Sequence, residues 1–190
     1  VEPRSVVALA VDGTSGTVLA TDGDGAPVGR AMMYNDAVDD RAVLDAIAAV
    51  APPTSAAHGS TSALAKAIVL ARGRGVTHIA HQADWIASLF SGELRVSDEN
   101  NALKTGYDPV GRAWPAWIAQ AGADADRLPR VIAPGTPVAT VTPAAAERFG
   151  LPAKAVVVAG TTDGCASFLA TGATGAGDGV TALGTSMTIK

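Results

Sequence analysis

Three short apolar runs in this 190-residue chain each end in a turn of glycine and hydroxyl residues, and two of these turns also contain aspartate. The runs and their turns are Val6–Val11 before Asp12–Thr17, Ala155–Ala159 before Gly160–Gly164, and Val180–Leu183 before Gly184–Ser186. Apolar runs of this length that stop at Gly or Asp are typical of buried strands. Because ligands of α/β proteins bind beyond the carboxyl ends of strands, the pattern predicts strands that deliver polar turns to a binding site.

The rest of the chain mixes further strands with amphipathic helices. We expect helices over Asp39–Val50, Ser62–Arg72, Gln82–Phe90, Pro115–Gln120 and Thr142–Gly150, and a small-residue helix that ends near Thr171. Strands are expected over Thr17–Thr21, Val28–Met33 and Met187–Ile189, and the first two would form an opening meander with Val6–Val11. Such a mixture predicts an α/β or α+β domain.

Composition excludes several classes of protein. The chain is 48% hydrophobic with a formal net charge of -4, which is too apolar and too weakly charged for a disordered chain. Its single cysteine excludes a disulfide framework. The mildly acidic balance argues against nucleic-acid or anionic-membrane partners. The apolar runs are far shorter than the roughly 18 residues of a membrane helix. These features favour a cytosolic protein.

Both ends of the sequence are unusual. It begins with Val1 rather than Met and stops at Lys190, inside a predicted strand. A complete domain more often ends in polar residues or in a docked helix. We therefore expect a piece of a longer chain, with a processed or tag-trimmed protein as the alternative.

Two of the turns, Asp12–Thr17 and Gly184–Ser186, combine backbone N–H groups with hydroxyls and lack bulky side chains. Such turns suit phosphate or polyhydroxyl ligands, although each also fits an ordinary turn. Asp163, at the end of an apolar strand, is suited to accept a proton from a substrate hydroxyl. The alternative is that Asp163 caps the helix that follows.

A further polar segment, Ser97–Asn101, has donors and acceptors that suit a sugar, with a solvated loop as the alternative. The histidines do not predict a metal site. His78 and His81 could share a helix face, but no cysteine or acidic ligand stands at a matching spacing. The sequence also lacks the P-loop and dinucleotide-binding glycine motifs.

Taken in order, five segments of the chain resemble the FGGY family of carbohydrate kinases. Val7–Asp22 is similar to the family's sugar-contacting turn and its flanking strands, and Ala31–Asp36 to an apolar run that ends in Trp-Asn-Asp. The others are Ser97–Thr105, which resembles a polar segment of glycerol kinases, Val156–Ala166, which resembles the turn that carries the catalytic aspartate, and Gly177–Ser186, which resembles the second phosphate-binding turn. The residues of Ser97–Lys104 and His81–Trp85 resemble the xylulokinase-like and D-ribulose kinase-like branch of the family more closely than they resemble glycerol kinases.

One segment fits two parts of the family pattern. Asp12–Gly16 also resembles the family's first phosphate turn, but Tyr34–Asp36 follows at the spacing seen after the sugar-contacting turn. The sugar-contacting assignment is therefore favoured, and it places the first phosphate turn and the adenosine-binding segment outside this sequence. The chain departs from the family at Val38, where Arg is usual, and at Gly164, where Asn or Gln is often found.

The resemblance implies an α/β, ribonuclease H-like lobe of the hexokinase, actin and 70-kDa heat-shock protein type, with a mixed sheet and flanking helices. Residues 1–174 would form the remainder of an N-terminal sugar-binding lobe, and residues 175–190 the first strands of a C-terminal ATP-binding lobe. The glycine-rich stretch Gly172–Gly179 would be the hinge between them.

The resemblance further implies ATP-dependent phosphorylation of a hydroxyl on a ketopentose such as D-ribulose or D-xylulose. Asp163 would be the general base. Thr14, Ser15, Gly16 and Glu99 would bind the sugar, and Gly184, Thr185 and Ser186 would contact the phosphates of ATP, bridged by Mg²⁺. The alternatives are a non-catalytic fragment or sugar-binding lobe without kinase activity, and a non-kinase ATPase of the same fold. On its own the 190-residue chain would not be a competent kinase.

Overall fold

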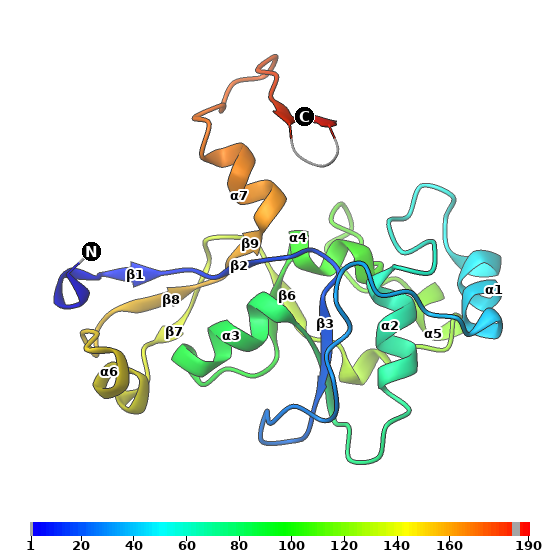
Figure 1. The fold of residues 1–190 in the computed structure, drawn as a ribbon, viewed down its shortest axis with the longest axis horizontal. Coiled ribbons are helices and arrows are strands. Elements are labelled where there is room, and N and C mark those ends of the chain that lie inside the picture. The colour runs from blue at the N-terminus through cyan, green and yellow to red at the C-terminus, as the bar shows by residue number, and fades with distance from the viewer. Residues whose placement is uncertain (1, 184–186) are drawn as a thin grey trace.

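A computed structural model describes residues 2–183 and 187–190 (Figure 1). The α-helices are α1 (Arg41–Val50), α2 (Ala63–Leu70), α3 (Gln82–Ser91), α4 (Glu99–Ala102), α5 (Trp117–Gln120), α6 (Pro143–Phe149) and α7 (Asp163–Leu169). The strands are β1 (Ala8–Leu9), β2 (Asp12–Gly13), β3 (Val18–Thr21), β4 (His78–His81), β5 (Val96–Asp98), β6 (Arg130–Ile132), β7 (Pro137–Thr140), β8 (Val156–Val158), β9 (Thr161–Thr162), β10 (Thr181–Leu183) and β11 (Met187–Ile189). Short 3-10 helices are η1 (Pro3–Ser5), η2 (Leu103–Thr105) and η3 (Ala125–Arg127).

The strands pair in both directions. A three-stranded sheet has the order β1-β8-β7, in which β1 and β8 are parallel and β7 and β8 antiparallel. Parallel pairs also join β2 to β9 and β5 to β6, and antiparallel pairs join β3 to β4 and β10 to β11. Mixed strand pairing with flanking helices confirms the expected α/β lobe.

The expected opening meander is wrong. Val6–Val11 does not pair with the strand that follows it, because β1 and β2 pair instead with β8 and β9 near the other end of the chain. The expected return strand Val28–Met33 is reduced to isolated bridges, one of which joins Met32 to Val18. Gly29 has a φ of 78°, which no regular strand adopts and which interrupts the segment.

The helices follow their caps. Asp40, Ser62 and Thr142 accept hydrogen bonds from backbone N–H groups in the first turns of α1, α2 and α6, and left-handed Gly92 and Gly150 follow α3 and α6. α2 packs its apolar face on β3 and α1 packs against α2, and the core there includes fully buried Leu64, Ile47 and Val18. A smaller cluster joins α6 to β8 through Val141, Ala145, Ala155 and Val157. These helices confirm the sequence expectation.

The structure excludes two possibilities that the sequence left open. His78 and His81 lie on strand β4 and share no helix face, because the segment pairs antiparallel with β3. Ser97–Asn101 is not a solvated loop: it is the end of β5 and the start of α4, and Asp98 and Asn101 are buried. The polar residues of this segment are needed for hydrogen bonds inside the protein.

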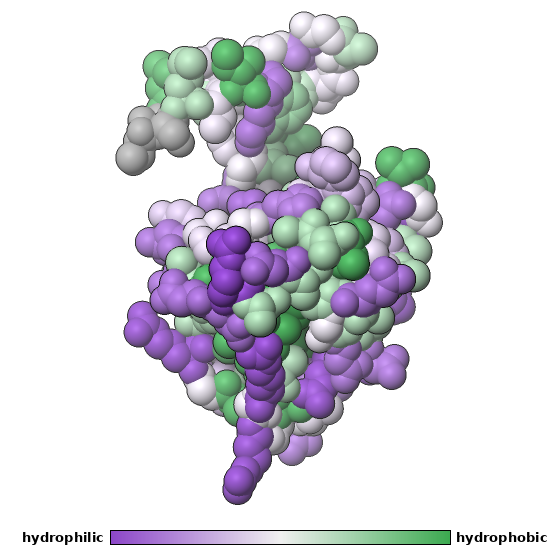
Figure 2. Space-filling model, turned by 90° about the vertical axis from the view of Figure 1, so that its right-hand side faces the viewer, coloured by the Kyte–Doolittle hydropathy of each residue, from purple (hydrophilic) through white to green (hydrophobic). Residues whose placement is uncertain are grey.

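The last part of the chain stands off from the rest. Figures 1 and 2 show α7 and the β10–β11 hairpin projecting away from the other elements. Leu169, Leu183, Met187 and Ile189 are exposed on this part. Of the helices in residues 2–183 and 187–190, none combines the length and the apolar character that a membrane crossing would need.

Candidate functional site

A parallel pair of strands joins a segment near the start of the chain to one that follows about 150 residues later. Asp12 and Gly13 of β2 pair in register with Thr161 and Thr162 of β9. The Thr14–Gly16 turn and Asp163 therefore leave the same edge of this ladder, although nearly the whole chain lies between them. The register places a turn of hydroxyls beside a carboxylate, which are groups suited to bind and deprotonate a polyhydroxyl ligand.

Asp163 is exposed at the first position of α7. One carboxylate oxygen accepts a 2.7 Å hydrogen bond from the N–H of Gly164. The helix cap is Thr162, whose hydroxyl accepts a 3.4 Å bond from the N–H of Cys165, so the capping role considered for Asp163 belongs to its neighbour. The second oxygen of Asp163 has no partner among the described residues.

The carbonyl groups of the Thr14–Gly16 turn are all occupied by donors from the protein. The Thr14 carbonyl accepts from the N–H of Thr17 at 3.2 Å, and the Ser15 carbonyl lies 3.5 Å from Nζ of Lys104. The Gly16 carbonyl accepts a 2.9 Å bond from Nζ of Lys66. Among the described residues, the hydroxyls of Thr14 and Ser15 form no hydrogen bond, so both remain available to a ligand.

Glu99 begins α4, and this helix is fastened to β9. The Asn100 side-chain amide donates to the Thr161 hydroxyl at 2.8 Å, and the Asn101 amide donates to the Thr161 carbonyl at 3.1 Å. Glu99 is thereby held on the strand that leads into Asp163. Its own carboxylate, which is 21% exposed, pairs with Nε of Arg112 at 3.0 Å.

Arg112 is the one non-glycine residue with a positive φ, 52°, within residues 2–183 and 187–190. It lies between Asp108 and Ala113, whose backbones bridge to close a short loop. The ion pair with Arg112 leaves one of the Glu99 oxygens free to accept a bond from a ligand hydroxyl.

Asp98 anchors the start of α4. One of its oxygens accepts from the N–H groups of Asn100 and Asn101, and the other accepts a 2.6 Å bond from the Asn101 side chain. Burial raises the pKa of this carboxyl, and the hydrogen bonds from Asn101 act in the opposite direction. Asp98 therefore has a structural role beside Glu99.

An open hollow of about 440 Å³ lies next to the ladder, lined by both of its strands and by α7. Its lining includes Asp12, Thr161, Gly160, Ala166 and Leu169. None of the residues expected to bind the sugar or to act as general base lines this hollow.

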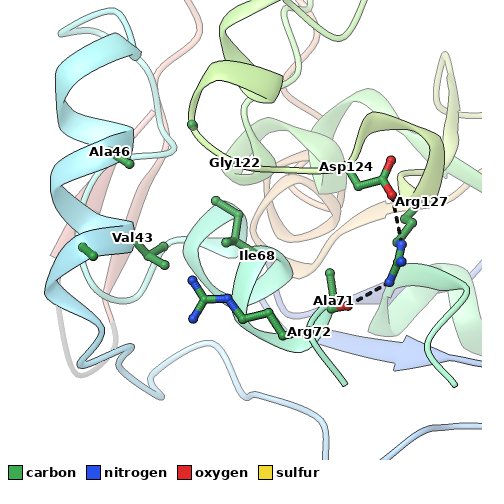
Figure 3. A pocket seen from close by; sticks show the side chains of 10 residues that line it. Val43, Ala46, Ile68, Ala71, Arg72, Gly122, Asp124 and Arg127 are labelled. Carbon is green, nitrogen blue, oxygen red and sulfur yellow. Dashed lines mark hydrogen bonds and ion pairs between the residues drawn. The ribbon is translucent and has the colours of Figure 1, made fainter. Parts of the chain in front are cut away.

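A separate hollow of about 340 Å³ lies between α1, α2 and the segment after α5 (Figure 3). Figure 3 shows the Arg127 side chain bonded to Asp124 and to the carbonyl of Ala71. Arg72, on the wall of the hollow, pairs with Asp40 at 2.6 Å. None of the residues expected to bind sugar or phosphate lines it.

Gly184, Thr185 and Ser186, expected at the ATP phosphates, lie outside the described residues. Val38, which stands where the family has Arg, is buried in the core beside α1 and α2. Gly164 is half-buried beside Asp163.

Sequence reasoning missed two groups that shape this site. Lys66 holds the turn through its ammonium, and Asn100 with Asn101 ties α4 to β9. The signal for Lys66 was its place as the one charged residue in the otherwise apolar α2. No group of three or more potential metal ligands stands within residues 2–183 and 187–190.

Comparisons with known proteins show similarity to kinases that act on small molecules. No family model matches the sequence. The autoinducer-2 kinase of Klebsiella pneumoniae is 46% identical over 80 residues, which cover 41% of this chain and 15% of that protein. The crystal structure of xylulose kinase from Rhodospirillum rubrum matches with a TM-score of 0.81 and 26% identity, covering 96% of this chain and 40% of that one.

A second xylulose kinase, the ligand-bound form from Lactobacillus acidophilus, matches with a TM-score of 0.80. Its sequence identity is 14%, and the match covers 100% of this chain and 41% of that chain. This likeness concerns the fold alone. The chain spans less than half the length of each of these three proteins.

Proposed function

We infer that the chain belongs to the FGGY family of carbohydrate kinases, and we propose that it supplies the sugar site of an enzyme that phosphorylates a sugar hydroxyl with ATP. In this proposal residues 1–174 form most of the sugar-binding lobe, and residues 175–190 begin the ATP-binding lobe. Gly172–Gly179 is the hinge, and Gly184–Ser186 contact the ATP phosphates.

One observation carries the proposal: the register of β2 with β9, which sets the Thr14–Gly16 turn beside Asp163. Phosphoryl transfer requires a group that accepts the nucleophile's proton and groups that position the nucleophile. The exposed carboxylate of Asp163 supplies the first, and the unbonded hydroxyls of Thr14 and Ser15 with Glu99 supply the second.

The proposed reaction proceeds in one displacement. A sugar hydroxyl gives its proton to a carboxylate oxygen of Asp163 as its oxygen forms a bond to the γ-phosphorus of ATP. The bond from that phosphorus to the β–γ bridging oxygen breaks, and ADP leaves. Closure about the hinge excludes water, which limits the loss of ATP to hydrolysis.

Mg²⁺ would enter this site with the nucleotide. The described residues contain no cluster of three or more potential ligands, and Mg²⁺ in kinases is commonly held through substrate phosphates with one or two carboxylates. When bound, the ion neutralises charge on the phosphates. The residues described above would bind and orient the sugar and take up its proton.

The names of the relatives suggest the substrates to test. We propose a ketopentose, D-xylulose or D-ribulose, and include autoinducer-2 because a 46% identical relative is named for it. The full-length protein would be assayed for sugar-dependent release of ADP from Mg-ATP with each of the three compounds. Stoichiometric sugar phosphate would support the proposal, and Mg-ATP binding without turnover of any polyol would contradict it.

A binding experiment separates the lobe from the whole enzyme. We expect the 190-residue chain to bind the preferred sugar in calorimetry and to show no measurable affinity for Mg-ATP. Tight Mg-ATP binding by this chain would contradict the proposed division into lobes.

A further inference from the structure

Lys66 is a fully buried charged side chain in an apolar helix. It is 0% exposed and is the one charged residue of α2, among Ala63, Leu64, Ala67 and Ile68. Burying an ammonium costs free energy unless each of its donors finds a partner.

The partners of Lys66 are three backbone carbonyls. Nζ donates to Gly16 at 2.9 Å, to Met33 at 2.7 Å and to Tyr34 at 3.2 Å. An ammonium has three protons, so these bonds use all of them. Within residues 2–183 and 187–190, Lys66 forms no ion pair. Burial lowers the pKa of its ammonium, while Asp36 raises it and Lys104 lowers it further.

These bonds connect two segments that the sequence holds apart. Gly16 belongs to the turn after β2 and has a φ of 87°. Met33 and Tyr34 belong to a turn that Asp36 closes by accepting a 2.7 Å bond from the N–H of Met33. The ammonium thus holds the turn that leads out of the β2–β9 ladder against a second turn, from inside the protein.

This arrangement separates support from ligand binding. The three carbonyls of Thr14, Ser15 and Gly16 are bonded within the protein, whereas the hydroxyls of Thr14 and Ser15 are unbonded among the described residues. The bond from Lys66 to the Gly16 carbonyl is buried, whereas the contact from Lys104 to the Ser15 carbonyl is exposed. The bond from Lys66 fixes the last carbonyl of the turn.

We propose that Lys66 is a positioning residue for sugar binding, which acts by fixing the Thr14–Gly16 turn in register with Asp163 and does not itself contact the sugar. This inference rests on the proposed kinase function. Loss of the ammonium frees the Gly16 carbonyl and lets the hydroxyls of the turn move from the positions that a sugar requires. A shift of about 1 Å at such a site commonly costs a large factor in rate or affinity.

A graded series of variants in the full-length protein tests this role. Lys66→Arg keeps the charge and donors, Lys66→Gln keeps two donors without charge, and Lys66→Met keeps the length alone. The assay uses the sugar that the wild type prefers. The KM for this sugar should rise least in Lys66→Arg, more in Lys66→Gln and most in Lys66→Met, where we expect about tenfold or more. The KM for Mg-ATP should stay within about twofold in all three. Lys154→Met, at an exposed lysine, is the matched control and should match the wild type.

The outcomes are distinguishable. If the variants lower only the urea midpoint, while the sugar KM of the folded protein is unchanged, Lys66 is a structural residue and the inference is wrong. An equal rise in the KM for sugar and for Mg-ATP would also overturn it. If Lys66→Met does not fold, the Arg and Gln variants carry the same comparison. A wild type that phosphorylates no sugar would instead overturn the proposed function, and this inference with it.

Discussion

The side-chain amide of Asn100 donates a 2.8 Å hydrogen bond to the hydroxyl of Thr161, 61 residues further along the chain. Asn100 follows Glu99 on α4, and Thr161 opens the strand that leads into Asp163. The bond therefore fixes two candidate site carboxylates relative to each other without using either one. Site geometry here depends on polar side chains that would not contact substrate.

A double-mutant cycle measures this bond. Asn100→Ala and Thr161→Val each remove one partner, and the pair should show a coupling free energy of about 0.5–1.5 kcal/mol in urea unfolding. Asn100→Ala combined with Arg41→Ala, on distant α1, is the control and should be additive within about 0.5 kcal/mol. Additivity of the first pair would mean that the bond contributes nothing to stability.

Replacement of Asp163 tests the proposed general base. Asp163→Asn keeps the shape of the side chain but cannot accept the proton, so turnover by the full-length protein should fall at least about a hundredfold. Steady-state ADP release checks this. Asp24→Asn, at an exposed turn carboxylate, should leave turnover unchanged. Near-normal turnover of Asp163→Asn would remove Asp163 from the mechanism.

Gly160 lies directly against the backbone of Val11. A Cβ at this position would overlap the carbonyl oxygen of Val11, and backbone cannot move aside as a side chain can. We expect Gly160→Ala to lower the free energy of unfolding by about 3 kcal/mol or more. Gly23→Ala, where a Cβ meets nothing within 4 Å, should be close to neutral in the same urea titration.

Asp40 predicts an acid-dependent loss of stability. The hydrogen bond from Arg72, with a further bond from the N–H of Val43, holds the pKa of Asp40 below its ordinary value of 3.8. A carboxyl whose pKa is lower in the folded state stabilises the protein above the unfolded pKa. That stabilisation is lost as the pH falls below about 3.8, through the folded pKa.

Asp40→Asn keeps the helix cap and removes the charge. Its urea midpoint should lie below that of the wild type at pH 7, and the gap should narrow near pH 3. Asp45→Asn breaks an exposed pair with Arg41 and should change the midpoint little at either pH. A gap that is equal at both pH values would show that the charge of Asp40 does not contribute.

Helix positions were predictable because their signals are local. Thr142 before Pro143 predicted the start of α6, and its hydroxyl accepts from the N–H of Ala145 at 3.3 Å as a cap should. Gly150 predicted the end of that helix and adopts a φ of 66°. These features depend only on residues within one or two turns of the chain.

Strand pairing was not predictable in the same way. β4 contains two histidines, and one of them, His81, is buried because its ring nitrogens bond to Ser97, Asp84 and Thr105 from other elements. The four residues His78–His81 do not by themselves predict those hydrogen-bond partners. The pairing of β2 with β9 likewise depends on contacts that no short window contains.

In the candidate site, too, local features were predictable and contacts between distant segments were not. Thr14–Gly16, Glu99 and Asp163 were predicted from local residue patterns and from the resemblance of their segments to one family. Their support, from Lys66 and Asn100, was missed because a lysine in a helix and an asparagine in a polar segment both usually face water. Their role follows only from where the backbone carries them.

The late partners of β1 and β2 also determine when this protein folds. The pairing of β3 with β4 joins residues about 60 positions apart, whereas the first two strands must wait for residues 156–162, nearly 150 positions after them. At ordinary rates of synthesis that wait is on the order of ten seconds. During it the apolar segment Val6–Val11 lacks its strand partner and is exposed to aggregation.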